Sequence, residues 1–254
     1  MDSIVKQRAD APPGFFEAEA AGIRWLADAG GAAVAAVVDV AAGRIELERV
    51  EHVEPTARAA HQFGRDLATT HKAGAPAFGS GPDGWDGPLF IGRREMPRVE
   101  SESWGEFYAT GRVLPFADAA VAAGNITEAE LQTVQKACEA VTAGHFDDDA
   151  PPSRIHGDLW GGNVLFGPQG VVMIDPAAHG GHAETDLAML ALFGAPHLAE
   201  IINGYQSVAP LRSGWEERIP LHQLHPLAVH AAGHGRSYGV ELARAARATL
   251  GLTG

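Results

Sequence analysis

Four polar residues in the middle of the chain have the types and the spacing that phosphoryl transfer requires. The chain reads Ile155-His156-Gly157-Asp158-Leu159-Trp160-Gly161-Gly162-Asn163, with a histidine before an aspartate and an asparagine after it. Asp175 follows at the end of the apolar run 171–174. The spacing H-x-D-x-x-x-x-N, followed by a hydrophobic strand that ends in aspartate, is typical of a kinase catalytic loop and its metal site.

The chemistry of a transferred phosphoryl group explains why these residue types are needed. The group carries dispersed negative charge, and Mg²⁺ bridges its oxygens. Because Mg²⁺ prefers hard oxygen ligands, Asn163 and Asp175 are predicted to hold it. Asp158 is then free to accept the proton of an attacking hydroxyl group. We expect His156 to hydrogen-bond the loop backbone rather than to react.

Each of these motifs taken singly is more often structural than catalytic. A His-Gly-Asp sequence is a common turn, and Ile-Asp-Pro is a common end of a strand. Their joint occurrence at these offsets favours a kinase-type site with ATP and Mg²⁺ as cofactors.

Two segments near the start of the chain can supply further nucleotide contacts. Residues 3–8 are expected to form a strand that carries Lys6, and a helix is expected over about 14–29. Lys6 is predicted to bind the α- and β-phosphates, and Glu19 on the helix to hold Lys6. Singly these are ordinary surface charges, and Glu17 is an alternative partner for the lysine.

The next segment is expected to close a small N-terminal lobe. Residues 33–40 and 44–50 look like a strand pair. The second strand ends in a predicted hinge, where Glu48 and Val50 would lie against the adenine of ATP. We therefore expect a small lobe over residues 1–54 and a large helical lobe over 55–254.

Helical periodicity dominates the large lobe. Thr127 and Glu130 form a predicted capping box at the start of one helix. Asp186 is expected to brace the catalytic loop from below. The other predicted helices cover about 57–72, 104–113, 184–193, 197–206, 215–230 and 237–250, and residues 74–88 are expected to form a loop.

Composition restricts the classes of function. The chain has 254 residues and a net charge of −13, which disfavours nucleic acid and anionic membranes as partners. The single cysteine, Cys138, excludes an internal disulfide and fits a reducing cytoplasm. The apolar run 32–38 is too short to span a bilayer, and no signal peptide is visible.

The twelve histidines raise the alternative of a metal site. His222 and His225, and likewise His230 and His234, have helical spacing. No glutamate follows His230, so the H-E-x-x-H pattern of zinc proteases is absent. A zinc hydrolase is therefore a remote alternative.

The combined motifs resemble the fructosamine kinase (ketosamine-3-kinase) family over nearly the whole chain. The tryptophan after His-Gly-Asp-Leu, joined to a later Asp-Pro-Ala, separates this family from aminoglycoside and choline kinases. The segments that carry the resemblance are 156–163, 174–177, 181–184 and 186–188, together with 16–20, 90–92, 104–108 and 230–238.

This resemblance implies an α+β, protein-kinase-like two-lobe fold and a phosphotransferase that uses ATP and Mg²⁺. The implied acceptor is the 3-hydroxyl of a small-molecule or protein-bound ketosamine such as a fructosamine or ribulosamine, and its phosphorylation leads to deglycation. The resemblance also gives Asp158 the role of catalytic base. Substrate contacts are expected near Trp104, Trp160, His179 and His182.

The sequence departs from the family pattern at two places. Lys6 stands only five residues after Met1, so the glycine-rich hairpin that relatives carry ahead of the lysine strand is expected to be missing. We expect nucleotide binding to be weak and dependent on Mg²⁺, and the open sheet edge to support a homodimer. The family's Pro-Gln-x-Asn reads Pro97-Arg98-Val99-Glu100, which predicts a different specificity.

Two other functions compete with the ketosamine kinase. One is a kinase for another hydroxylated amine, such as an aminoglycoside or a choline-like alcohol. The other is a pseudokinase that binds nucleotide weakly because the glycine-rich loop is absent. The intact Asp158, Asn163 and Asp175 argue against the pseudokinase.

Overall fold

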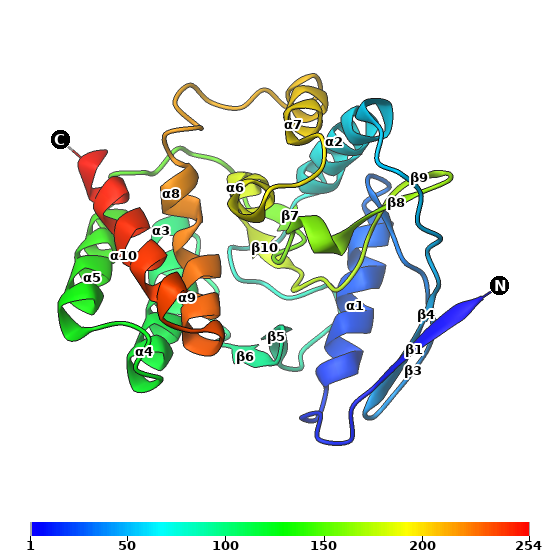
Figure 1. Cartoon of the computed structure of the whole chain (residues 1–254), viewed down its shortest axis with the longest axis horizontal. Coiled ribbons are helices and arrows are strands. Elements are labelled where there is room, and N and C mark those ends of the chain that lie inside the picture. Colours follow the sequence, from blue (N-terminus) through cyan, green and yellow to red (C-terminus); the bar gives the residue numbers. More distant parts are fainter. Residues whose placement is uncertain (1, 254) are drawn as a thin grey trace.

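A small antiparallel sheet and one helix form the N-terminal part of the computed structural model, which describes residues 2–253. The strands are β1 (Ser3–Gln7), β3 (Val37–Ala41) and β4 (Arg44–Glu48), in the order β1-β4-β3. Helix α1 (Phe15–Asp28) covers one face of this sheet (Figure 1). Alternation along β4 buries Ile45 and Leu47, which pack against the apolar stripe of α1.

A second three-stranded sheet joins the N-terminal part to the rest of the chain. Strand β2 (Ala33–Val34) pairs in parallel with β9 (Gly170–Met173), and β9 pairs with β8 (Val164–Gly167). The strand that leads to Asp175 is therefore fixed against the segment that follows α1. We propose that the chain divides into two lobes at residue 54. This sheet crosses the boundary, because β2 lies before it and β8 and β9 lie after it.

The larger part consists of two helical groups that pack around separate cores (Figure 1). The first packs α2 (Ala57–Lys72), α6 (Ala183–Phe193) and α7 (Leu198–Gln206) around a core with Leu159. The second forms the other large core, and its elements are α3 (Trp104–Glu106), a π-helix (Phe107–Val113), α4 (Leu114–Ala122), α5 (Glu128–Thr142), α8 (Ile219–His222), α9 (Leu224–His234) and α10 (Arg236–Gly251).

Helices α2 and α7 meet at two glycines. A Cβ at Gly64 would lie 1.9 Å from the carbonyl oxygen of Ile201, and a Cβ at Gly204 would lie 1.9 Å from that of His61. Only glycine allows the two backbones to approach so closely. The same pair of helices brings Tyr205, near the end of α7, to His71, near the end of α2.

Most of the predicted elements are present, and the differences arise from long-range pairing. The helix over 57–72 and the capping box of Thr127 and Glu130 are confirmed. The predicted strand over 33–40 is divided, because β2 pairs with β9 whereas β3 pairs with β4. The predicted helix over 215–230 is wrong in its extent, since α8 and α9 begin at 219 and 224.

Two short antiparallel strand pairs complete the fold. Strands β5 (Leu89–Ile91) and β6 (Arg94–Met96) form a hairpin beside α1, which the sequence analysis did not predict. Strands β7 (Ser153–Ile155) and β10 (His179–Gly181) bring the start of the catalytic loop next to the segment after Asp175. Among residues 2–253, none of the helices combines the length and the apolar composition that crossing a bilayer requires.

Candidate active site

His156 holds the catalytic loop, residues 155–163, to the segment that leads from β9 to Asp175. Its Nε2–H donates to the carbonyl oxygen of Ile174 at 2.9 Å, and its Nδ1 accepts the backbone N–H of Asp158 at 3.2 Å. These roles require the neutral imidazole, and burial lowers the pKa of His156 accordingly. The predicted backbone role of this histidine is confirmed.

Asp186, at the start of α6, braces the same loop from below. Its carboxylate accepts the backbone N–H groups of His156 at 2.8 Å and Gly157 at 2.9 Å. It also pairs with Nε2 of His71 at 3.0 Å, and Nδ1 of His71 meets the Tyr205 hydroxyl at 2.9 Å. Burial opposes ionisation, but the contacts with His71 and the loop hold the pKa of Asp186 below its ordinary value. The predicted bracing role is present.

Asp158 and Asn163 are connected by direct hydrogen bonds. The Asn163 side-chain N–H donates to the Asp158 carbonyl oxygen at 2.8 Å and approaches Asp158 Oδ2 at 3.4 Å. The backbone N–H of Ile174 donates to the Asn163 carbonyl at 3.1 Å, which ties the loop to the strand before Asp175. Burial, and then the charges of Asp175 and Asp186, raise the pKa of Asp158 to about 7. A carboxylate with this pKa can accept a proton near neutral pH.

Lys6 connects Glu19 on α1 to Asp175. Its Nζ lies 2.7 Å from Glu19 Oε1 and also pairs with Asp175 Oδ1. Burial would lower the pKa of Lys6, but the two carboxylates raise it, so the lysine is held as a cation. The ion pair with Glu19 is the one that the sequence predicts, whereas Glu17 lies on a separate cleft with Trp25 and Trp85.

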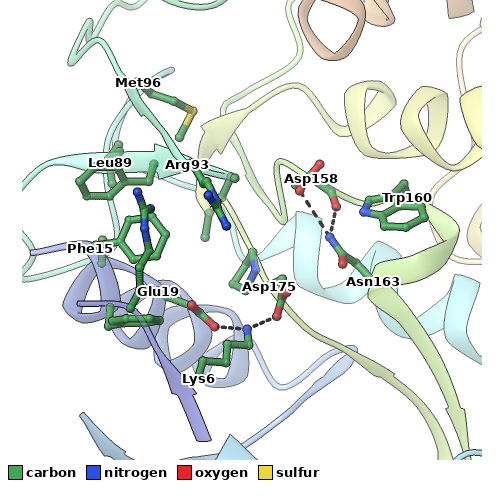
Figure 2. Close-up of a pocket in the computed structure, with 18 of the residues that line it drawn as sticks. Lys6, Phe15, Glu19, Leu89, Arg93, Met96, Asp158, Trp160, Asn163 and Asp175 are labelled. Carbon is green, nitrogen blue, oxygen red and sulfur yellow. Dashed lines mark hydrogen bonds and ion pairs between the residues drawn. The ribbon is translucent and has the colours of Figure 1, made fainter. Parts of the chain in front are cut away.

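One cavity of about 670 Å³ brings these groups together (Figure 2). Lys6 and Glu19 lie on one side of it and Asp158, Asn163 and Trp160 on the other, with Asp175 between them. The remaining wall comes from the start of α1 and from the β5–β6 hairpin, with Phe15, Leu89, Phe90, Arg93 and Met96.

The donor atoms on this cavity suit a magnesium ion. The Asn163 amide uses its nitrogen toward Asp158, and its oxygen has no hydrogen-bond donor among residues 2–253, so it can act as a ligand. The Asp175 side chain is 45 % exposed, and its residue has a left-handed φ of 55°. A strained backbone of this kind is typical of functional sites. A carboxylate and an amide oxygen form the hard donor set that Mg²⁺ prefers.

Five of the predicted site residues do not line this cavity. Glu48 ends β4 and Val50 packs beside the β8–β9 turn at Gly167, so their contact with adenine stays a prediction. Trp104, His179 and His182 are buried in the interior instead. His179 and His182 follow Asp175 closely in the sequence, but proximity in sequence does not fix where a side chain points. The roles of these two histidines and of Trp104 as substrate contacts stay predictions.

His182 belongs to a buried polar network with Glu184 and His222. Their ligand atoms lie within 4.8 Å of one another, as a metal site would require. Arg218 already pairs with both oxygens of Glu184, at 2.6 and 3.0 Å, and His182 pairs with Asp148 at 3.2 Å. This arrangement satisfies the ligand atoms without a cation, which disfavours the zinc alternative.

This network should make the protein sensitive to acid. The contacts with His222 and Arg218 lower the pKa of Glu184 to about 2 against the effect of burial, and burial lowers that of His222 to about 4. A carboxylate whose pKa is depressed in the folded state stabilises the fold fully when the pH is above its pKa in the unfolded chain, which is about 4.3. This stabilisation is lost as the pH falls toward the folded-state pKa. Neutral His222 acts in the same direction, so the melting temperature should fall between pH 6 and pH 3.

Glu184→Gln tests this expectation. The variant should lose about 2 kcal/mol at pH 7, and its melting temperature should fall less steeply with acid than that of the wild type. Glu216→Gln, at an exposed position, is the control. A Glu184→Gln profile parallel to the wild-type profile would show that the network does not carry the acid sensitivity.

Comparison with known proteins agrees with this geometry. The family model described as fructosamine kinase matches residues 2–251. The chain belongs to the fructosamine kinase family. Its enzymatic class is therefore that of a phosphotransferase with an alcohol group as acceptor, and the family membership implies that it uses a nucleotide.

Three known proteins illustrate what this fructosamine kinase family member is similar to. A probable ketoamine kinase from Enterococcus faecium is 31% identical over 236 residues, which are 90% of this chain and 80% of the relative. A solved structure assigned as a fructosamine-3-kinase from Thermobifida fusca is 44% identical with a TM-score of 0.91, and covers 98% of this chain and 85% of that chain. A choline kinase from Streptococcus pneumoniae, at 18% identity and a TM-score of 0.63 over 98% of this chain and 86% of that chain, shares the fold. The predicted kinase-like α+β fold is confirmed.

Proposed function

We propose that this protein transfers the terminal phosphate of ATP to the 3-hydroxyl of a ketosamine, such as a fructosamine or ribulosamine, and so initiates deglycation. The observation that carries the proposal is that Asp158, Asn163 and Asp175 line one cavity with the Lys6–Glu19 pair. The 44% identity to a structure assigned as a fructosamine-3-kinase supports the choice of acceptor.

Each residue of the cavity has a distinct task in this reaction. Asn163 and Asp175 would hold Mg²⁺, which supplies positive charge to the phosphate oxygens when it is bound. Lys6 grips the α- and β-phosphates, and Glu19 keeps it in position. Asp158 orients the sugar hydroxyl and takes its proton as the new O–P bond forms.

The acceptor side of the cavity has an apolar and aromatic character. Trp160 is 41% exposed and stands on this wall, so we propose it as a sugar contact. Phe15 and Phe90 meet edge to face at 5.1 Å on the opposite wall, beside Met96. Such surfaces can pack against the alkyl chain of a lysine that carries the sugar.

We place the activity in the cytoplasm, where the reduced Cys138 would be stable.

Mass spectrometry of the product tests the acceptor. The protein should add one phosphate to fructosyl- or ribosyl-lysine in the presence of ATP and Mg²⁺, and the product should release free lysine on standing. An aminoglycoside and choline serve as competing acceptors in the same panel. Phosphate transfer to those alcohols without transfer to the ketosamines would overturn the proposal.

The free edge of β1 is the surface that would support the proposed homodimer. Within residues 2–253, β1 pairs only with β4, and its Ile4 and Val5 are 43% and 47% exposed. An exposed strand edge with apolar side chains can pair with a second chain. Light scattering should give twice the monomer mass, and Val5→Lys should lower it. A monomer at high concentration would contradict this proposal.

A further inference from the structure

Three cationic side chains line the active-site cavity, and one of them is uncommitted. Lys6 is paired with Glu19 and Asp175. Arg8 pairs with Asp10 at 2.9 Å and lies over the Phe15 ring at 5.2 Å. Arg93 takes part in none of the hydrogen bonds or ion pairs that the described residues 2–253 form with one another, and its charge acts on Asp10, the partner of Arg8, only as a minor contribution to the lowered pKa of that carboxylate. A guanidinium in a cavity that binds phosphate is therefore available to a ligand.

The β5–β6 hairpin places Arg93, an exposed residue, at its turn. Leu89, Ile91 and Met96 are nearly fully buried, and they anchor both strands. The neighbouring Arg94 turns away and donates to the carbonyl oxygen of Ala232 at 2.6 Å. Arg93 follows Gly92, whose φ of 53° makes the turn. Figure 2 shows its side chain extending from this turn into the cavity, between Phe15 and Asp158.

The charges around the cavity indicate what Arg93 would bind. The carboxyl groups of Asp158 and Asp175 line the cavity, and the charge of Lys6 is neutralised in part by its two carboxylate partners. The transferred phosphoryl group spreads negative charge over three oxygens. A free guanidinium presents donors in a planar fork that matches phosphate oxygens. The hairpin supplies this group from the large lobe, on the side away from β4.

We propose that Arg93 is a catalytic residue that contacts the terminal phosphate of the bound nucleotide during its transfer. This inference rests on the proposed kinase function and adds a residue to it. The transfer breaks the bond between the terminal phosphorus and the bridging oxygen of ADP and forms a bond to the acceptor oxygen, whose proton goes to Asp158. Arg93 donates hydrogen bonds to the phosphate oxygens throughout.

Nucleotide calorimetry gives the first test, since it does not depend on the acceptor. Arg93→Met should weaken binding of a non-hydrolysable ATP analogue with Mg²⁺ about tenfold or more and leave MgADP affinity within about twofold. Arg93→Lys should recover part of the loss. Arg58→Met, an exposed position on α2 outside the cavity, is the matched control and should bind both nucleotides like the wild type. Equal affinities of Arg93→Met and wild type for the analogue would overturn the inference.

Kinetics with two ketosamines give the second test. The kcat of Arg93→Met should fall about a hundredfold or more with both fructosyl-methylamine and fructosyl-glycine. A loss confined to fructosyl-glycine would show that Arg93 binds the acceptor carboxylate, and would overturn the inference. If the wild type phosphorylates no ketosamine, the proposed function fails, and the contrast between ATP analogue and ADP still decides the role of Arg93.

Discussion

Asp158→Asn is expected to reduce phosphate transfer at least about a thousandfold, because asparagine cannot take the proton of the acceptor hydroxyl. Asparagine has nearly the same shape, and its oxygen can still accept from the Asn163 amide that lies 3.4 Å from Asp158 Oδ2. Nucleotide affinity and the melting temperature should therefore change little. Rapid-quench measurement of a single turnover separates the transfer step from binding and product release.

The control for this variant is Asp118→Asn. Asp118 is an exposed carboxylate on α4 that is not part of the cavity. It should transfer phosphate at the wild-type rate. Unchanged turnover in Asp158→Asn would remove Asp158 from the mechanism and would favour the pseudokinase or a different base.

Asp186→Asn should damage both stability and activity. The aspartate uses both oxygens to accept two backbone N–H groups, and it also pairs with His71. An asparagine in this position has one oxygen, and its NH₂ group would face another donor. We expect a loss of about 3 kcal/mol in the free energy of unfolding, because a buried charge-assisted network is broken. The kcat should fall at least about tenfold, since His156 and Gly157 position Asp158.

Urea unfolding and steady-state kinetics test this prediction together. Tyr205→Phe is the graded control, because it removes only the hydroxyl that meets His71 and should cost about 1 kcal/mol. The kinetics are measured at a temperature at which Asp186→Asn is folded. Wild-type stability and rate in that variant would show that the carboxylate does not hold the loop.

The local motifs could be predicted from sequence because backbone geometry constrains them. The offset between Asp158 and Asn163 places both residues on one short loop, and the backbone hydrogen bond from Ile174 to Asn163 holds the segment before Asp175 to that loop. The ion pair of Lys6 with Glu19 was predictable only through the kinase pattern, since both residues look like ordinary surface charges. The bracing role of Asp186 was likewise predictable only through the kinase pattern.

Other parts of the site depend on packing that the sequence does not display. Strands β2 and β5 have two and three residues, which is too short for an alternation of apolar and polar side chains to be recognised. Arg93 enters the cavity only because β5 pairs with β6 and Arg94 turns the other way. Trp104 and His179 are buried for a similar reason, because neighbouring helices cover them.

Heteronuclear NMR of the reaction product tests the central claim most directly. The protein is incubated with ATP, Mg²⁺ and fructosyl-lysine, and a phosphorus–proton correlation spectrum is recorded. We predict a new phosphomonoester signal that couples to the proton on carbon 3 of the sugar, and that is absent with Asp158→Asn or when Mg²⁺ is chelated. The absence of any phosphomonoester with the wild type, or a phosphate on another carbon, would contradict the account.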